Sequence, residues 1–384
     1  MARAALLACS LLLLCLALAG GTDAAKKTVG VYKLKNKKGD FSIKVTNWGA
    51  TLMSVIVPDS KGNLADVDAS SAFGTVVGRV ANRIANGSFV LDGKTIRLNK
   101  DGTTVLHGGH RGFNRVIWTV KEYVPGGDSP YITLYYHSFD REQGPKKFDT
   151  KFFHVNLRDT LTSLIYITPS SLASPRNQVP GDLDVYVTYQ LGCSPYELKA
   201  RMNATALNKA TPVNLANHAY WNLAGDGSGD ALGHLIKVFA SRYTPVDASM
   251  IPTGEIAPVS GTPYDLRTPT LLGSRIKHVS GAGMAGFDIN YAVDGDGFRQ
   301  VAYLRDPASG RALELWANQP GVQLYTSNWL NNVKGKGGRV YGQYGAVCLE
   351  TQAFPDAVHH PNFPSEIVRP GGAYQHDMLF KFSF

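Results

Sequence analysis

The sequence predicts an all-β protein built as a large antiparallel β-sandwich. Short runs alternate apolar and polar residues, as strands with one buried face do, and the clearest are 41–45, 131–135, 183–189 and 322–326. Clusters rich in Gly, Asp, Asn and Pro separate such runs at the spacing of strands and turns. Long amphipathic helices are scarce, and Leu272–Ile276 is the candidate for a short one. This pattern favours two packed antiparallel sheets in one domain.

The turn clusters have distinct positions along the chain. Asp-Gly pairs stand at 92–93 and 101–102, a Pro-Gly-Gly-Asp cluster at 125–128 and an Asp-Gly-Asp-Gly cluster at 294–297. Glycine and aspartate tolerate the backbone conformations that tight turns need. We expect a tight turn at each of these positions.

The composition of the 384-residue chain excludes several other classes of protein. Hydrophobic residues make up 44% of it, which rules out a disordered chain, and no short repeat indicates a collagen or a coiled coil. The formal net charge is +9, but the basic residues stand in short pairs such as Lys37-Lys38 and form no dense run. We therefore expect no nucleic-acid partner.

The N-terminus has the pattern of a secretory signal peptide. A basic residue precedes an apolar run from Ala4 to Ala19, and small residues follow it. Cleavage after Ala19 and cleavage after Ala24 both fit. An uncleaved membrane anchor is disfavoured because the run is short, and no later stretch is apolar enough to cross a bilayer. We expect a signal peptide at 1–24, a domain at 25–384, secretion, and no membrane attachment after cleavage.

Two features of the expected mature chain bear on this route. Removal of the leader leaves Cys193 and Cys348, which are too few for a disulfide-built fold. The two could pair, but Cys348 lies in the apolar stretch 346–349, which favours a buried free thiol. Asn86 and Asn203 each begin an Asn-x-Ser/Thr sequon and are the expected glycosylation sites.

Three residues are candidates for acid–base chemistry. His107 lies between turn signals and is followed by two glycines, which allow close backbone approach. His218 lies in the segment 217–223, whose aromatic faces suit sugar C–H surfaces and whose asparagines suit hydroxyls. Glu350 follows an apolar run, and burial would raise its pKa and favour a general base. The alternatives are hydrogen-bonded or core histidines and an ion-paired structural glutamate.

Further polar residues, and the absence of several known motifs, limit the kinds of reaction and cofactor that the sequence favours. Asp288 and the pair Asn82-Arg83 are candidates for hydroxyl recognition, although each has an ordinary structural interpretation. No metal site is expected, because the adjacent His359 and His360 would point in opposite directions on a strand and no zinc-type spacing occurs. No phosphate-loop or dinucleotide fingerprint appears in a strand-turn-helix context, and the serine-hydrolase motif Gly-x-Ser-x-Gly is absent. The residues indicate acid–base catalysis without a cofactor.

Ordered motifs from about Val29 to the C-terminus resemble those of the aldose 1-epimerase family. They are Asn47-Trp48-Gly49-Ala50-Thr51, Gly78-Arg79-Val80-Ala81-Asn82-Arg83-Ile84, Leu106-His107-Gly108-Gly109, Asn217-His218-Ala219-Tyr220-Trp221-Asn222, Gly261-Thr262-Pro263-Tyr264-Asp265, Pro320-Gly321-Val322-Gln323-Leu324-Tyr325 and Leu349-Glu350-Thr351-Gln352. The resemblance implies a large antiparallel β-sandwich. It also implies an enzyme that interconverts the α and β anomers of free aldoses such as galactose and glucose, without metal or nucleotide, and we expect a monomer.

The resemblance further implies roles for single residues. Glu350 matches the base that takes the proton of the C1 hydroxyl, and His218 matches the acid that protonates the ring oxygen. His107 matches a second histidine near the ring oxygen. The sugar-binding positions are matched by Asn82, Arg83, Asp288 and Gln323.

Two segments depart from the family pattern. An early strand is missing where 66–71 runs almost directly into Phe73-Gly74, and the basic segment 144–178 has neither strand alternation nor a helical stripe. We interpret 144–178 as an atypical insertion that stems from an error in the gene model, and we expect poor solubility of the chain as written. Two other functions stay open: a non-catalytic carbohydrate-binding protein on the same fold, and a hexose 6-phosphate 1-epimerase. The latter needs cations beyond Arg83 and conflicts with secretion.

Overall fold

The computed structural model of the chain describes residues 28–69, 74–98, 103–142, 148–157, 160–169, 179–192, 194, 196–281 and 283–384. The expected signal peptide, the turn at 101–102 and Cys193 lie outside these residues. The regular secondary structure of the described chain is almost entirely antiparallel β-strand, as the alternation predicts. The short helix expected from Leu272 is present as α2 (Leu272–Arg275), which a 3₁₀ turn at Ile276–His278 continues.

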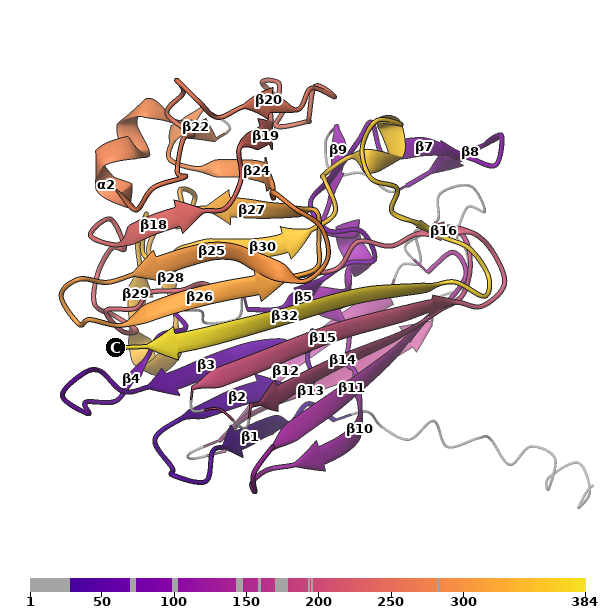
Figure 1. Ribbon diagram of the computed structural model, residues 1–384. Coiled ribbons are helices and arrows are strands. Elements are labelled where there is room, and N and C mark those ends of the chain that lie inside the picture. The colour runs from indigo at the N-terminus through magenta and orange to yellow at the C-terminus, as the bar shows by residue number, and fades with distance from the viewer. Residues whose placement is uncertain are drawn as a thin grey trace, which may run out of the picture.

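One layer of the fold is a nine-stranded sheet that crosses the molecule (Figure 1). Its strands, in spatial order, are β10 (Thr119–Val124), β11 (Tyr131–Ser138), β14 (Leu183–Leu191), β15 (Glu197–Ala206), β32 (Ala373–Ser383), β26 (Ala312–Ala317), β25 (Arg299–Arg305), β18 (Leu235–Val238) and β21 (Thr270–Leu271). Burial alternates residue by residue along β11 and β14, so one face of the sheet is covered and the other is open to solvent.

The opposite layer contains two smaller antiparallel sheets. The first has four strands: β1 (Val31–Lys35), β2 (Ser42–Thr46), β3 (Thr51–Val57) and β4 (Ala65–Asp66). The second has five strands in the order β20 (Ala257–Pro258), β19 (Arg242–Thr244), β24 (Asp288–Ala292), β27 (Gly321–Tyr325) and β30 (Cys348–Gln352). All five residues of β30 are buried, so this strand has protein on both faces.

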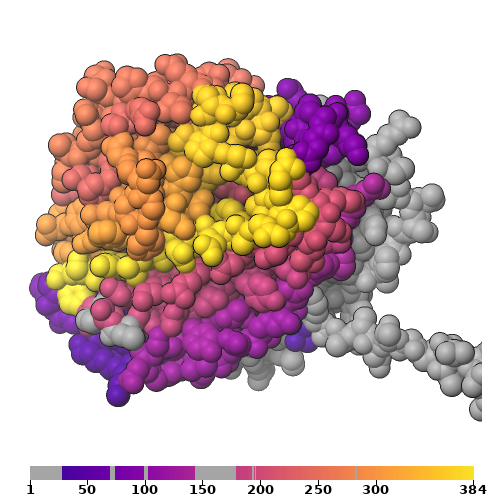
Figure 2. Space-filling model, turned by 45° about the vertical axis from the view of Figure 1, so that its right-hand side comes forward, coloured from indigo at the N-terminus to yellow at the C-terminus, as the bar shows by residue number. Residues whose placement is uncertain are grey.

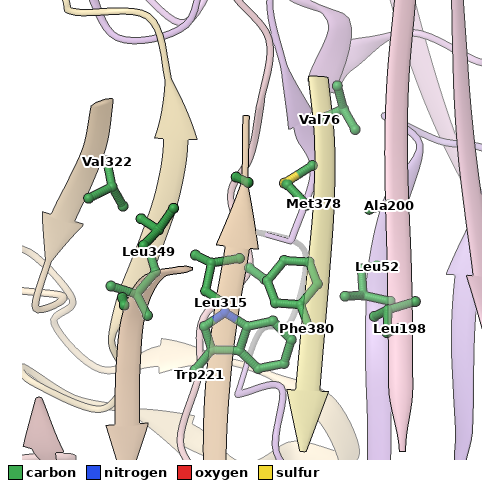
Figure 3. Close-up of a cluster of buried hydrophobic side chains, with 14 of the residues drawn as sticks. Leu52, Val76, Leu198, Ala200, Trp221, Leu315, Val322, Leu349, Met378 and Phe380 are labelled. Carbon is green, nitrogen blue, oxygen red and sulfur yellow. The ribbon is translucent and has the colours of Figure 1, made fainter. Parts of the chain in front are cut away.

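The core fills the space between these layers (Figure 3). Leu315 and Phe380 come from the nine-stranded sheet, and Leu349 comes from the five-stranded sheet. Trp221, which is fully buried, packs against Phe380 with ring centroids 5.2 Å apart. Each large side chain removed from water contributes roughly 1.5–3 kcal/mol. This packing fixes the five-stranded sheet against the rest of the molecule.

Short ribbons connect the sheets and border the site described below. They are β5 (Val76–Val77) with β17 (Ala216–Asn217), β6 (Arg83–Ala85) with β9 (Thr104–Leu106), β7 (Ser88–Leu91) with β8 (Lys94–Arg97), β16 (Thr211–Pro212) with β31 (Ile367–Val368), β22 (Ser280–Gly281) with β23 (Met284–Ala285), and β28 (Val333–Lys334) with β29 (Val340–Tyr341). Figure 2 shows the purple β7–β8 ribbon beside the yellow C-terminal part of the chain, where Arg369 pairs with Asp92 at 2.8 Å.

Most expectations for strands and turns agree with the described residues. The turns at 92–93, 125–128 and 294–297 join β7 to β8, β10 to β11 and β24 to β25. The segment 144–178, whose sequence shows neither clean strand alternation nor a helical stripe, does contain strands. This segment contains β12 (Phe148–Leu157) and β13 (Thr160–Pro169), which pair with each other and with no other named strand. The missing early strand stays a prediction, because residues 70–73 lie outside the described chain.

Three further expectations concern the cysteine, the sequons and membranes. Cys348 is a buried free thiol, as its apolar surroundings predict. Asn86 is exposed in the turn between β6 and β7, and Asn203 is exposed in β15. Among the described residues, no helix has the length and apolar character that a membrane crossing requires.

Candidate active site

The floor of the candidate site is one face of the five-stranded sheet. Side chains alternate along β24, β27 and β30, so neighbouring cross-strand rows face opposite sides of the sheet. The core-facing row is Ile289, Leu324 and Leu349, and the row on the other face is Asn290, Gln323 and Glu350. The polar row is buried, which costs free energy unless the groups find partners. Such a row indicates a site built for a polar ligand.

His218 reaches this floor from a separate segment. It directly follows β17, and its main-chain N–H donates to the carbonyl of Thr75 at 3.0 Å. Its Nε2 lies 3.4 Å from Oε1 of Glu350, and the two side chains are 13% and 3% exposed. Within the described chain, Nδ1 of His218 and Oε2 of Glu350 are buried and have no hydrogen-bond partner. The pair therefore keeps hydrogen-bonding capacity that a ligand can use.

His107 faces the same site and is locked to Asn82. The main-chain N–H of His107 donates to the carbonyl of Asn82 at 2.9 Å, and the main-chain N–H of Asn82 donates to Nδ1 of His107 at 3.1 Å. Because Nδ1 accepts, the neutral ring carries its proton on Nε2. The ring meets His218 edge to face, with centroids 5.3 Å apart. His107 thus presents a hydrogen-bond donor beside the Glu350–His218 pair.

Asp288 occupies the other side of the floor. Its Oδ1 accepts a hydrogen bond from Nε2 of Gln323 at 2.6 Å, and its Oδ2 lies 3.7 Å from Nη2 of Arg83. The Arg83 and Asp288 side chains are 18% and 11% exposed, so the ion pair is partly shielded from water. The main-chain N–H of Arg83 donates to the side-chain oxygen of Asn82 at 2.9 Å. Asn82 therefore connects this ion pair to His107, to which it is hydrogen-bonded.

Burial shifts the pKa values of the site in opposite directions for acids and bases. It raises the pKa of Glu350 well above its usual range, with a further rise from Asp288 and an offset from Arg83. Burial lowers the pKa of His218 to about 4 and, with His218 and Arg83 nearby, lowers the pKa of His107 well below 6.5. Glu350 is buried, as the apolar run before it predicts. The Glu350 carboxylate is a stronger base, and the His218 imidazolium a stronger acid, than either would be in water.

Two tyrosines enclose His218. The ring of Tyr220 stacks on the imidazole with centroids 5.0 Å apart and an angle of 8° between the planes. Tyr325 stands perpendicular to both, at 6.5 Å from His218 and 6.4 Å from Tyr220. Trp221, next in sequence to Tyr220, faces the opposite way into the core. The two adjacent aromatic side chains therefore point in different directions: Tyr220 contacts His218 in the candidate site, and Trp221 packs in the main hydrophobic core.

The described residues hold one group whose donor atoms could surround a metal ion. The ligand atoms of His107, His218 and Glu350 all lie within 4.8 Å of one another. His107 fits a metal poorly, because its Nδ1 accepts from Asn82 and its Nε2 must then lose a proton to become a ligand. The donor set fits proton transfer better than metal binding.

The expectation that His359 and His360 point in opposite directions on a strand is wrong, because the segment forms a 3₁₀ turn (Ala357–His359). Both rings approach the same carboxylate: Nδ1 of His359 lies 2.6 Å from Oδ1 of Asp356, and Nε2 of His360 lies 3.6 Å from Oδ2. Asp356 also accepts the main-chain N–H of Ala85 at 2.9 Å. This group holds the loop against β6, close to the site.

The structure brings all seven expected catalytic and sugar-binding residues into one connected group. They are Asn82, Arg83, His107, His218, Asp288, Gln323 and Glu350. Sequence analysis did not single out Tyr220, Tyr325 or Gln352, which extend the group. Tyr325 and Gln352 lie two positions after Gln323 and Glu350, so strand periodicity was a signal for both. Tyr220 lies in the aromatic segment 217–223 noted above, but the sequence does not distinguish it from Trp221.

The sequence is similar to those of known aldose 1-epimerases along most of its length. The model of the aldose 1-epimerase family matches residues 30–171 and 162–381. Galactose mutarotase from Homo sapiens is 39% identical over 368 residues, which cover 92% of this chain and 94% of that protein. Aldose 1-epimerase from Escherichia coli is 27% identical over 362 residues, which cover 89% and 93%.

Solved structures agree with the architecture. The aldose epimerase homologue from C. elegans superimposes with a TM-score of 0.76 at 26% identity and covers 92% of this chain and 99% of that chain. Galactose 1-epimerase from Lactobacillus acidophilus has a TM-score of 0.71 at 20% identity and covers 92% and 98%. At that identity the second likeness concerns the fold alone.

Proposed function

The chain belongs to the aldose 1-epimerase family, and we propose that Glu350 and His218 are the acid–base pair with which it interconverts sugar anomers. The protein is a mutarotase, an isomerase of the α and β forms of aldoses. The candidate site holds a carboxylate beside an imidazole, and this arrangement supports the proposal. The roles of single residues are argued below from their geometry.

The distance between Nε2 of His218 and Oε1 of Glu350 carries this proposal. In a cyclic aldose, the C1 hydroxyl oxygen and the ring oxygen are bonded to the same carbon. A base for one and an acid for the other must therefore lie only a few Å apart, each within hydrogen-bond reach of its oxygen. The 3.4 Å separation of the two side chains matches this requirement.

The proton transfers balance over one turnover. Glu350 and His218 share one proton, and the reactive form is the one in which His218 holds it. The Glu350 carboxylate takes the C1 hydroxyl proton while His218 gives its proton to the ring oxygen; the bond from C1 to the ring oxygen breaks and a C1 carbonyl forms. Rotation about C1–C2 exposes the other carbonyl face. His218 then takes back the proton of the released hydroxyl, the oxygen attacks C1, and Glu350 returns its proton to the carbonyl oxygen. Each turnover leaves the pair as it began.

The neighbouring residues suit binding and orientation of the sugar. His107 offers its Nε2–H beside His218, where it can donate to the ring oxygen region, and its lowered pKa keeps it neutral. Asp288 offers carboxylate oxygens to sugar hydroxyls, while Arg83 and Gln323 fix its position. We assign these residues, with Asn82, to substrate binding.

Polarimetry with freshly dissolved α-D-glucose and α-D-galactose tests the proposal. We expect decay of optical rotation faster than the spontaneous rate, proportional to protein concentration. A protein that binds these sugars without accelerating the decay would be a non-catalytic binder, and the assignment of Glu350 and His218 would fail. We expect no preference for glucose 6-phosphate, because Arg83 is already paired with Asp288.

We also propose that the mature protein is secreted and glycosylated. The exposure of Asn86 and Asn203 supports modification at both sequons. Expression in a secretory host should give a product that lacks residues 1–24 or 1–19 and that shifts in mobility after glycosidase treatment. The variants Asn86→Gln and Asn203→Gln should each remove part of the shift. A cytosolic product that retains Met1 would contradict this route.

We further propose that 144–178 is an insertion produced by an error in the gene model. The two family matches overlap at residues 162–171, and β12 and β13 pair only with each other, which supports an added segment. Sequencing of the transcript should give a shorter reading frame here and an additional early strand. A transcript that encodes the chain as written would contradict this interpretation.

A further inference from the structure

The Nδ1 atom of the candidate acid, His218, lacks the contact to another residue that usually orients a catalytic imidazole. In most such sites one ring nitrogen donates to a carboxylate or carbonyl, which fixes the plane of the ring. Here Nε2 faces Glu350, and the buried Nδ1 has no hydrogen-bond partner from another residue in the described chain; the one main-chain hydrogen bond that acts on the imidazole is to His218 itself. Another interaction must therefore keep Nε2 directed at the reacting oxygens.

Aromatic contacts supply such an interaction. The ring of Tyr220 lies parallel to the imidazole, 8° off plane, with a centroid distance of 5.0 Å. Tyr325 and His107 meet the imidazole nearly at right angles, at 86° and 70°. Aromatic pairs in such stacked and edge-to-face arrangements contribute about 0.5–1.5 kcal/mol each beyond the burial of their surface. Tyr220 covers a face of the ring, so it restricts the tilt that would move Nε2.

Tyr220 is itself held rigidly. It is 6% exposed, its main-chain carbonyl accepts the N–H of Ala69 at 2.8 Å, and it packs in a cluster with Leu330, Tyr341 and Cys348. The segment that contributes Tyr341 is tied at two points. Lys336 pairs with Asp66 at 3.0 Å, and Arg339 pairs with Asp226 at 2.8 Å. A residue fixed in this way can fix its neighbour.

We propose that Tyr220 is the positioning residue of His218, and that its ring face takes the place of an orienting hydrogen bond from another residue. The flat π face below the imidazole also stabilises the imidazolium that proton transfer requires, by a cation–π interaction. This inference rests on the proposed function, because it assigns Tyr220 to the same proton-transfer step. The tyrosine hydroxyl has no part in it.

Three variants separate this role from a merely structural one. Tyr220→Phe keeps the ring, whereas Tyr220→Leu and Tyr220→Met fill the volume without a flat π face. Tyr243→Leu is the matched control, because Tyr243 also stacks on an aromatic ring, that of Tyr264, at 4.8 Å, and belongs to β19 rather than to the group around His218. Polarimetry gives kcat and KM, and thermal unfolding reports the stability of each variant.

We expect Tyr220→Phe to keep kcat within about threefold of the parent. Tyr220→Leu and Tyr220→Met should lower kcat by roughly 10- to 100-fold at nearly unchanged KM, the scale expected when a reacting group is misplaced by about 1 Å. Their acid limb of kcat should move to lower pH, because the imidazolium loses its π partner. Tyr243→Leu should lose stability without a change in kcat or in the pH profile.

The outcomes distinguish this proposal from the proposed function. Near-parental kcat in both Tyr220→Leu and Tyr220→Met would overturn the positioning role, and so would an equal loss in Tyr220→Phe, which would point to the hydroxyl. Should Tyr220→Leu fail to fold, Tyr220→Met and Tyr220→Phe still decide the matter. The proposed function fails instead when His218→Asn retains full activity.

Discussion

Gln323 lies directly opposite Glu350 in the register of β27 and β30, and its side-chain amide donates to Oδ1 of Asp288 at 2.6 Å. One sheet therefore sets the distance between the candidate base and the candidate sugar-binding carboxylate. Backbone pairing fixes this spacing more firmly than a loop would, since a one-residue slip would turn Glu350 into the core. Because the two carboxyl groups have different neighbours, substitutions at each should affect different kinetic constants.

Replacement of Glu350 by glutamine should remove catalysis while leaving sugar binding. The amide keeps the size of the side chain but cannot accept the C1 hydroxyl proton, so kcat should fall by roughly 10²-fold or more. His218→Asn should have a similar effect. The double variant should be scarcely slower than either single one, because both groups serve one proton-transfer step. Polarimetry measures the rates, and near-normal turnover in Glu350→Gln would end the mechanism.

Asp288→Asn should weaken saturation by sugar more than it slows turnover. The variant loses the negative charge that Arg83 faces at 3.7 Å and a charged acceptor for sugar hydroxyls. Loss of a hydrogen bond to a charged group is worth about 1.5–3 kcal/mol, which corresponds to roughly a 10- to 100-fold rise in KM. We expect kcat to change by less than about fivefold. Initial rates over a range of galactose concentrations give both constants, and a loss confined to kcat would place Asp288 in the chemistry.

The pH dependence of kcat/KM should show a broad plateau. Turnover needs one proton shared by Glu350 and His218. At low pH a second proton binds the pair, and since burial lowers the pKa of His218 to about 4, activity should persist to about pH 4. At high pH the last proton leaves, and the raised pKa of Glu350 moves this limb well above the range of ordinary carboxyls.

Spontaneous mutarotation, which acid and base also accelerate, must be subtracted at each pH. The acid limb should remain in Asp288→Asn, which serves as the control because Asp288 also has a raised pKa. An acid limb near pH 6.5 in both proteins would show that His218 titrates as an ordinary exposed histidine, against its burial.

Two strands that carry the site could be predicted from the sequence, one from its alternation and one from its apolar run. In 322–326 alternation predicts the strand that carries Gln323, and the apolar run 347–349 predicts a buried strand that ends near Glu350; the register of the two strands, which puts both residues on one face, comes from the structure. The lock between His107 and Asn82 could not be predicted, since it depends on left-handed backbone at both residues, with φ of 50° and 61°. Sequence patterns report periodicity, and neither residue belongs to a regular element of that kind.

Tyr220 and the pair His359-His360 show where pattern analysis fails for another reason. Tyr220 and Trp221 are both aromatic and both buried, yet they face opposite sides, and composition carries no information on which one meets His218. The two histidines converge on Asp356 because a 3₁₀ turn replaces the strand that we assumed. In both examples the direction of the side chains depends on local backbone conformation, which tertiary contacts set and sequence periodicity does not report.

Glu366 should make the stability of the protein depend on pH. It is 5% exposed, both carboxyl oxygens lack hydrogen-bond partners in the described chain, and burial, with Asp356 nearby, raises its pKa to about 8. The folded protein therefore holds a proton between about pH 4.5 and 8 that the unfolded chain releases, so the free energy of unfolding should fall as the pH rises through this window. Glu366→Gln cannot release a proton and should flatten this decline. Urea unfolding at pH 5, 7 and 9 measures it, with the exposed Glu255→Gln as control; parallel curves for parent and Glu366→Gln would contradict the assignment.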